Sequence, residues 1–160
     1  MTGGRLGRLR DHLSSTFLMT YGDGVGDIDL NALVDLHRAA GREATMTVAR
    51  PAARFGRAVI RGTRVTEFSE KPSSDGGDIN AGFFVLEPSV LNRIENDEAV
   101  FEQDVVPSLA RDGELSAYAH SGFWRPMDTL RDRNELERLW STGDAPWAVW
   151  NNSTVPRPVA

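Results

Sequence analysis

The chain has 160 residues, no cysteine and a formal net charge of −5 at pH 7. Its length fits one domain, the lack of cysteine excludes disulfides and thiolate metal sites, and the acidic balance argues against a nucleic-acid-binding surface. No apolar run reaches the length of a membrane span, and no apolar stretch of the signal-peptide kind follows the N-terminal arginines. We therefore expect a cytoplasmic protein that binds neither nucleic acid nor membrane.

The pattern of apolar residues predicts helices that alternate with strands. In chain order we expect a helix over 5–14, a buried strand over 16–21, a helix over 30–40, a strand over 45–49, a hairpin of 56–61 and 64–70, a strand over 79–86, helices over 89–95 and 101–112, a strand over 115–119 and a helix over 129–140. This order predicts an α/β fold with a mostly parallel central sheet flanked by helices. Ligands bind such sheets at the carboxyl ends of the strands.

The ends of one helix and the extent of the domain are also predicted. Asp27 or Asp29 is expected to cap the helix over 30–40, and Gly41 to end it. Residues 1–150 are expected to form the domain. The polar, proline-bearing residues 151–160 are predicted to be a disordered tail.

The first candidate for chemistry is Asp23, which lies between Gly22 and Gly24 directly after a predicted strand. Glycine lets a backbone approach a ligand closely, and a carboxylate offers the hard oxygen ligands that Mg²⁺ prefers. The alternative is an ordinary turn, because Asp-Gly is a common turn dipeptide.

Glu70 and Lys71 precede Pro72 at the end of another predicted strand. Lys71 is the only lysine among 18 basic residues, and a compact ammonium charge is not interchangeable with a guanidinium. A carboxylate can accept sugar hydroxyls while a lysine pairs with a phosphate. A solvated strand end is the alternative.

Two further polar residues stand beside predicted elements, and one lies near the N-terminus. Asn80, at the mouth of an apolar strand, is either a sugar-hydroxyl ligand or a satisfied turn residue. Asp128 is either the N-cap of the helix that follows or a second metal carboxylate, converging with Asp23 at one sheet edge. Arg5 follows two glycines, a combination that can approach a nucleotide but occurs often.

Together and in order, these motifs resemble the sugar-phosphate nucleotidylyltransferases, and within them the cytidylyltransferases that make CDP-glucose. The segments that carry the resemblance are Met1–Leu6, Thr20–Val25, Arg54–Gly56, Glu70–Pro72, Ile79–Pro88, Gly122–Asp132 and Ala145–Trp147. The resemblance runs to about residue 150, and Gly122–Asp132 is its most specific part.

The resemblance implies a Rossmann-like nucleotidyltransferase sheet and transfer of a cytidylyl group from CTP to glucose 1-phosphate, giving CDP-glucose and pyrophosphate. It implies that Asp23 and Asp128 hold Mg²⁺ and that Arg5 and Gly22 contact the nucleotide. The sugar phosphate is assigned to a third set: Glu70, Lys71 and Asn80.

The family's nucleotide-binding strands, with their glycine-rich Gly-Thr-Arg loop, do not appear in this sequence. We therefore expect an uncovered sheet edge, which favours self-association and leaves a homo-oligomer open, and we expect no CDP-glucose synthesis by this chain alone. The alternatives are a non-catalytic remnant of such an enzyme and an enzyme that uses UTP or dTTP.

Overall fold

The computed structural model describes residues 1–51, 57–69 and 77–151. The strands are β1 (Phe17–Thr20), β2 (Gly24–Gly26), β3 (Ala44–Ala49), β4 (Arg57–Arg61), β5 (Arg64–Ser69), β6 (Ile79–Leu86), β7 (Leu115–His120) and β8 (Trp124–Pro126). The α-helices are α1 (Thr2–Gly7), α2 (Leu30–Ala40), α3 (Val106–Arg111) and α4 (Leu130–Ser141). Short 3₁₀ turns form η1 (Arg10–His12), η2 (Pro88–Arg93) and η4 (Val149–Asn151), and a π-helical turn forms η3 (Phe101–Val105).

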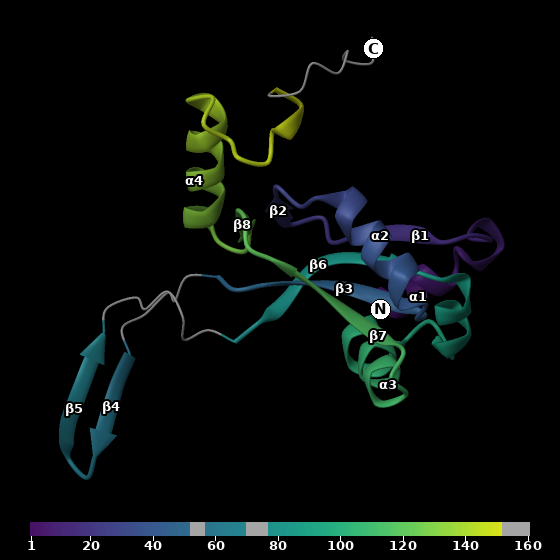
Figure 1. The fold of residues 1–160 in the computed structure, drawn as a ribbon, viewed down its shortest axis with the longest axis horizontal. Helices are drawn as coiled ribbons and strands as arrows, with labels where there is room; N and C mark the ends of the chain where they lie inside the picture. The colour runs from purple at the N-terminus through teal and green to yellow at the C-terminus, as the bar shows by residue number, and fades with distance from the viewer. Residues whose placement is uncertain (52–56, 70–76, 152–160) are drawn as a thin grey trace.

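A four-stranded sheet in the order β1-β6-β3-β7 forms the centre of the described part of the chain (Figure 1). β6 pairs antiparallel with both β1 and β3, and β3 pairs parallel with β7. β1, β3 and β7 therefore run in one direction, and their carboxyl ends lie at the same end of the sheet. We call this the carboxyl end of the sheet, and the opposite one its amino end.

The two faces of the sheet pack against different elements, and successive side chains along β3 point to opposite faces. Ala44 and Met46 face the main core, where Phe84 and Phe101 meet edge to face with ring centroids 5.5 Å apart. Thr45 and Thr47, on the other face, are fully buried. α2 lies over that face, with Leu33 and His37 as its buried residues.

The ends of α2 follow from local sequence. The Asp29 carboxylate accepts a hydrogen bond from the Ala32 N–H at 3.0 Å, so Asp29 is the N-cap and Asp27 is not. Gly41 ends the helix in the left-handed conformation, with φ of 61°. The predicted bounds of this helix are confirmed.

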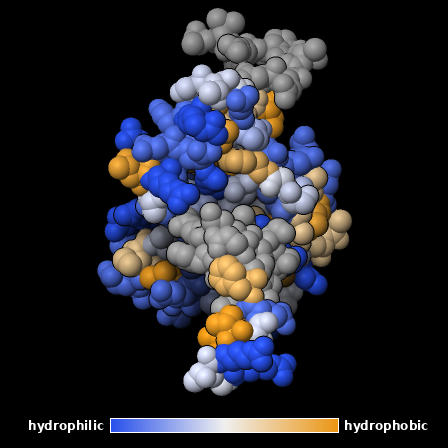
Figure 2. All heavy atoms as spheres, turned by 90° about the vertical axis from the view of Figure 1, so that its left-hand side faces the viewer, coloured by the Kyte–Doolittle hydropathy of each residue, from blue (hydrophilic) through white to orange (hydrophobic). Residues whose placement is uncertain are grey.

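The hairpin of β4 and β5 extends away from the sheet, as does α4 on another side (Figure 1). The space-filling view shows the hairpin as a projection on which apolar and charged surfaces adjoin (Figure 2). Ile60, Val65 and Phe68 are among its exposed apolar residues. Within the described ranges, no helix is long and apolar enough to cross a membrane.

Several predicted elements differ from the observed ones. The sheet is mixed rather than mostly parallel, because β6 lies between β1 and β3. β1 is half-buried rather than buried: it pairs only with β6 among the described strands, and Leu18 is 52% exposed. The helix expected over 5–14 ends at Gly7, and that expected over 101–112 begins as the π-helical turn η3.

Candidate functional site

A short two-stranded ribbon brings the backbones of the two candidate metal-binding residues, Asp23 and Asp128, close together at the carboxyl end of the sheet. β2 pairs antiparallel with β8, with Gly24 opposite Pro126 and Gly26 opposite Trp124. Beyond the last pair, the Met127 N–H donates to the Asp23 carbonyl at 2.7 Å. Asp128 is the next residue, so the backbone places Asp23 and Asp128 at adjoining positions although 105 positions separate them in the sequence.

Asp128 does not cap α4. Thr129 is the N-cap: its hydroxyl accepts from the Asp132 N–H at 3.1 Å, and the Asp132 carboxylate accepts from the Thr129 N–H at 3.2 Å. This reciprocal capping box satisfies the start of the helix. The capping alternative for Asp128 is therefore wrong. Its side chain is exposed and makes no hydrogen bond or ion pair with another described residue, and the same holds for Asp23.

A partly buried polar network lies directly before the ribbon and centres on Tyr21. The Tyr21 hydroxyl donates to Glu102 Oε1 at 2.5 Å and accepts from Asn80 Nδ2 at 3.1 Å. Desolvation, and then the Glu102 carboxylate, raise the pKa of Tyr21, so this hydroxyl stays protonated as a donor. Asn80 Oδ1 accepts from the Gly82 N–H at 2.8 Å, which supports the satisfied-turn alternative for Asn80.

Gly82 is required for this network. Its φ is +77°, a conformation that glycine adopts at little cost. A Cβ at this position would also lie 2.7 Å from the Tyr21 ring. The glycine therefore allows the start of β6 to pack against Tyr21, which in turn holds the Asp23 turn in place.

The other predicted site residues have different outcomes. Arg5 is exposed on α1, one turn after Thr2, whose hydroxyl donates to Glu102 at 2.9 Å. Gly22 is exposed, and nothing lies within 4 Å of where its Cβ would be. Glu70 and Lys71 lie outside the described residues. Sequence reasoning missed Glu102, because a single glutamate in a predicted helix carries no distinguishing pattern.

Gly3 and Gly4, which precede Arg5, have a packing role in α1. The Gly4 N–H donates to the Ala99 carbonyl at 3.2 Å. A Cβ on Gly4 would lie 2.1 Å from the Asp97 carbonyl oxygen. Close contact between α1 and the segment before η3 thus explains this glycine without a nucleotide.

The donor set at Asp23 and Asp128 fits Mg²⁺. This ion is commonly held by one or two carboxylates and completes its octahedron with water and substrate phosphates. Within the part of the chain that the structure describes, no three His, Cys, Asp or Glu residues gather as a metal site. A site built from two carboxylates and the substrate's phosphates needs no third side chain.

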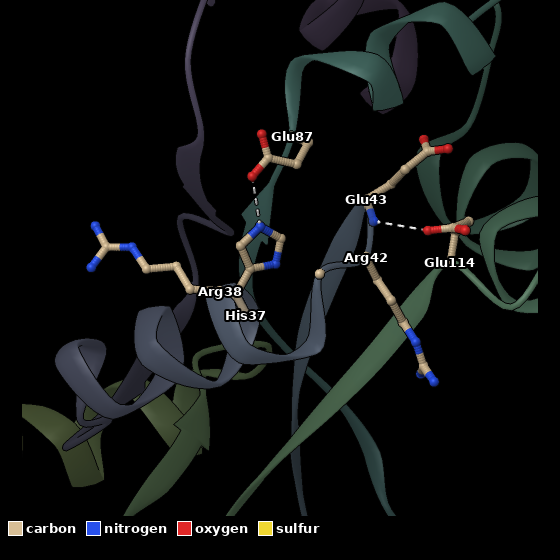
Figure 3. A pocket seen from close by; sticks show the side chains of 7 residues that line it. His37, Arg38, Arg42, Glu43, Glu87 and Glu114 are labelled. Carbon is tan, nitrogen blue, oxygen red and sulfur yellow. Dashed lines mark hydrogen bonds and ion pairs between the residues drawn. The ribbon is translucent and has the colours of Figure 1, made fainter.

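The amino end of the sheet carries a hollow, whose charged side chains already have protein partners (Figure 3). His37 contacts Thr45 through Nδ1 at 2.9 Å and Glu87 through Nε2 at 3.0 Å. The Glu43 N–H donates to the Glu114 carboxylate at 3.2 Å. Thr16, and then His37, lower the pKa of Glu87. These contacts indicate a structural role.

Comparisons with known proteins identify the family of this chain. The model of the nucleotidyl transferase family matches residues 7–139. The chain belongs to this family. The matched range includes the Asp23 turn, the Asn80 strand and the Asp128 motif, in that order. The predicted fold class and enzyme class are confirmed.

Curated relatives of this nucleotidyl transferase include glucose-1-phosphate cytidylyltransferases. The protein of that name from Salmonella typhimurium is 52% identical over 94% of this chain and 59% of its own length. A probable one from Bacillus subtilis is 40% identical over the same shares. The predicted resemblance is thus confirmed, and the chain spans about three fifths of the length of these relatives.

Solved structures show the same fold. HddC from Yersinia pseudotuberculosis has a TM-score of 0.64 at 19% identity, over 87% of this chain and 62% of that one. A putative glucose-1-phosphate thymidylyltransferase from Bacillus anthracis has a TM-score of 0.61 at 19% identity, over 84% of this chain and 58% of that one.

Proposed function

We propose that this chain carries the metal and sugar-phosphate site of an enzyme that transfers a cytidylyl group from CTP to glucose 1-phosphate, giving CDP-glucose and pyrophosphate. The observation that carries the proposal is the hydrogen bond from the Met127 N–H to the Asp23 carbonyl. This bond supports the proposal because it joins the backbone segments that carry Asp23 and Asp128, in a chain of the nucleotidyl transferase family.

Phosphoryl-type transfer requires positioning and charge neutralisation more than covalent chemistry from the protein. In this proposal Asp23 and Asp128 hold Mg²⁺, which when bound neutralises the charge of the substrate phosphates. Because neither carboxylate pairs with another described residue, both are available to serve as ligands. The Tyr21–Glu102 hydrogen bond fixes the turn before Asp23, so that little reorganisation is needed when the substrates bind.

The remaining residues of the proposal bind substrates. Lys71 pairs with the phosphate of glucose 1-phosphate, and Glu70 and Asn80 contact the sugar. Asn80 Nδ2 donates one of its two N–H groups to Tyr21, which leaves the other for a ligand. Arg5 and Gly22 contact the nucleotide. Because the carboxamide is already oriented by Gly82 and Tyr21, Asn80 is suited to a fixed hydroxyl group.

The test is an assay of pyrophosphate release with Mg²⁺, glucose 1-phosphate and each of CTP, UTP and dTTP. The chain is assayed alone and joined to the part of the Salmonella typhimurium relative that it does not match, because it spans 59% of that protein. We expect turnover in the joined protein with CTP and none from the chain alone.

Four outcomes bear against this proposal or a part of it. Faster turnover with UTP or dTTP than with CTP would assign a different nucleotide. No turnover in a folded, joined protein would favour a non-catalytic role. Turnover by the chain alone, at the rate of the joined protein, would show that the residues of this chain suffice for the triphosphate as well. A joined protein with Lys71→Arg that keeps normal kinetics would remove Lys71 from the site.

A further inference from the structure

The base of the β2–β8 ribbon is held by a buried histidine that the proposed chemistry does not use. His120 ends β7, and its side chain is 6% exposed. Its Nε2 lies 3.0 Å from the Phe123 carbonyl, which also accepts the Asp27 N–H at 3.1 Å. One carbonyl oxygen thus ties the last strand of the sheet to both strands of the ribbon.

Asp27 meets the same ring. Its Oδ1 lies 3.1 Å from His120 Nε2 and is buried, yet it has no hydrogen-bond donor within the described ranges. The single Nε2–H is directed at the Phe123 carbonyl, so the carboxylate gains attraction from the ring without a bond of its own. A side chain and a backbone carbonyl therefore share one donor at this point.

Gly122 leaves the space for this contact. A Cβ there would lie 2.4 Å from Asp27 Oδ1 and 2.8 Å from His120 Cε1. Trp124, two residues later, adds a second fixed point, since its indole N–H donates to the Ala81 carbonyl at 2.9 Å. The ribbon is thus attached to β7 through His120 and to β6 through Trp124.

We propose that the His120–Asp27 pair is a positioning element that sets the direction of the ribbon and thereby the separation of the Asp23 and Asp128 carboxylates. Asp27 and Phe123 stand at one end of the three-residue ribbon, and Asp23 and Met127 at the other. Asp23 and Asp27 are four residues apart, so at roughly 3.3 Å per residue the two ends are about 13 Å apart, and a small tilt at the base moves the tip. This role rests on the proposed metal site.

The experiment titrates the full chain with Mn²⁺, which stands in for Mg²⁺, and follows by NMR the paramagnetic broadening of the Gly24 and Met127 amide signals. His120→Phe keeps a ring of similar size but has no N–H donor. His120→Gln restores a donor near the position of Nε2. Gly122→Ala introduces the methyl group that the pair excludes, and Gly77→Ala is its control, because a Cβ at Gly77 meets nothing within 4 Å.

We expect Mn²⁺ to bind about 10-fold more weakly to His120→Phe and Gly122→Ala, the scale seen when a residue behind a metal ligand is changed. His120→Gln and Gly77→Ala are expected to bind as the unaltered chain does. Equal affinity in a folded His120→Phe would overturn the positioning role alone, and so would a His120→Gln variant as weak as His120→Phe. If Gly122→Ala does not fold, the two His120 variants decide. No broadening in the unaltered chain would overturn the metal site and the positioning role together.

Discussion

The two ends of the central sheet use charge in opposite ways. At the amino end, Arg93 donates to Glu43 at 3.1 and 3.0 Å and also pairs with Asp112, so each charge has a partner. At the carboxyl end, the side chains of Asp23 and Asp128 make no hydrogen bond or ion pair with other described residues. The contrast separates carboxylates that stabilise the fold from carboxylates that are available to a ligand.

The same contrast explains why the hollow at the amino end is not the candidate site. Its charged groups are neutralised within the protein, so a ligand would have to replace existing hydrogen bonds. At the carboxyl end, neither Asp23 nor Asp128 would have to give up a side-chain hydrogen bond or ion pair with another described residue in order to bind a cation. Removing charge at the two ends should therefore have opposite consequences for stability and activity.

The largest effect is expected at the carboxyl end. Asp23→Asn and Asp128→Asn should each lower pyrophosphate release by the joined protein at least ~10²-fold, the scale for losing one group that stabilises charge in the transition state. Neither variant should be less stable, because neither removes a side-chain hydrogen bond or ion pair with another described residue. Steady-state kinetics and thermal unfolding of the two variants measure both effects. Asp35→Asn, which changes an exposed carboxylate on α2, is the matched control.

The Tyr21 network before the ribbon should contribute to stability. Tyr21→Phe leaves Glu102 Oε1 and Asn80 Nδ2 without their shared hydroxyl, so the free energy of unfolding should fall by about 1–3 kcal/mol. Tyr118→Phe is the control, because the Tyr118 hydroxyl makes no hydrogen bond with other described residues. Denaturant unfolding compares the two. Equal losses would mean that the Tyr21 network contributes nothing beyond its ring.

At the amino end, Arg93→Met should lower stability and leave kinetics unchanged. The variant keeps the aliphatic part of the side chain but leaves Glu43 and Asp112 unpaired, and loss of the partly exposed Glu43 pair alone should cost about 1 kcal/mol. Arg111→Met removes a guanidinium that only approaches Asp112 at 3.9 Å and should cost less. A fall in turnover of the joined Arg93→Met protein, without unfolding, would contradict the division between the two ends.

The smallest effect is a dependence of stability on pH. Arg93 lowers the pKa of Glu43 from its ordinary value of 4.5, so around pH 4.5 the unfolded chain binds more protons at this position than the folded chain. The stabilisation is present above pH 4.5 and is lost as the pH falls through the folded-state pKa. Unfolding curves between pH 6 and pH 3 should show this loss, and Glu43→Gln should reduce the slope. An unchanged slope would mean that this pair does not couple to folding.

Much of the fold could be predicted because local sequence determines it. Asp29, Gly41 and the apolar face between them fix α2, and the run of apolar residues from Ile79 to Leu86 fixes β6. The pairing order could not be predicted: nothing local in β6 shows that it lies antiparallel between β1 and β3. β2 and β8 were missed, since three residues are too few for an alternating pattern to show.

The candidate site was predicted in part. The order of the motifs indicated the family. The positions of Asp23 and Asp128 beside predicted elements led us to expect both at one edge of the sheet. Contacts between distant parts of the chain could not be foreseen, as with the bond from Tyr21 to Glu102, which lies 81 residues away. The same holds for His120, whose proposed positioning role depends on a glycine two residues later.

The most direct test of the central claim is the position of Mn²⁺ in a crystal of the chain, located by anomalous diffraction. The account predicts one ion bound by carboxylate oxygens of both Asp23 and Asp128, at about 2.1–2.2 Å, slightly longer than the ~2.0–2.1 Å typical of Mg²⁺. An ion held by only one of them, or two carboxylates that face separate regions of the surface, would contradict it.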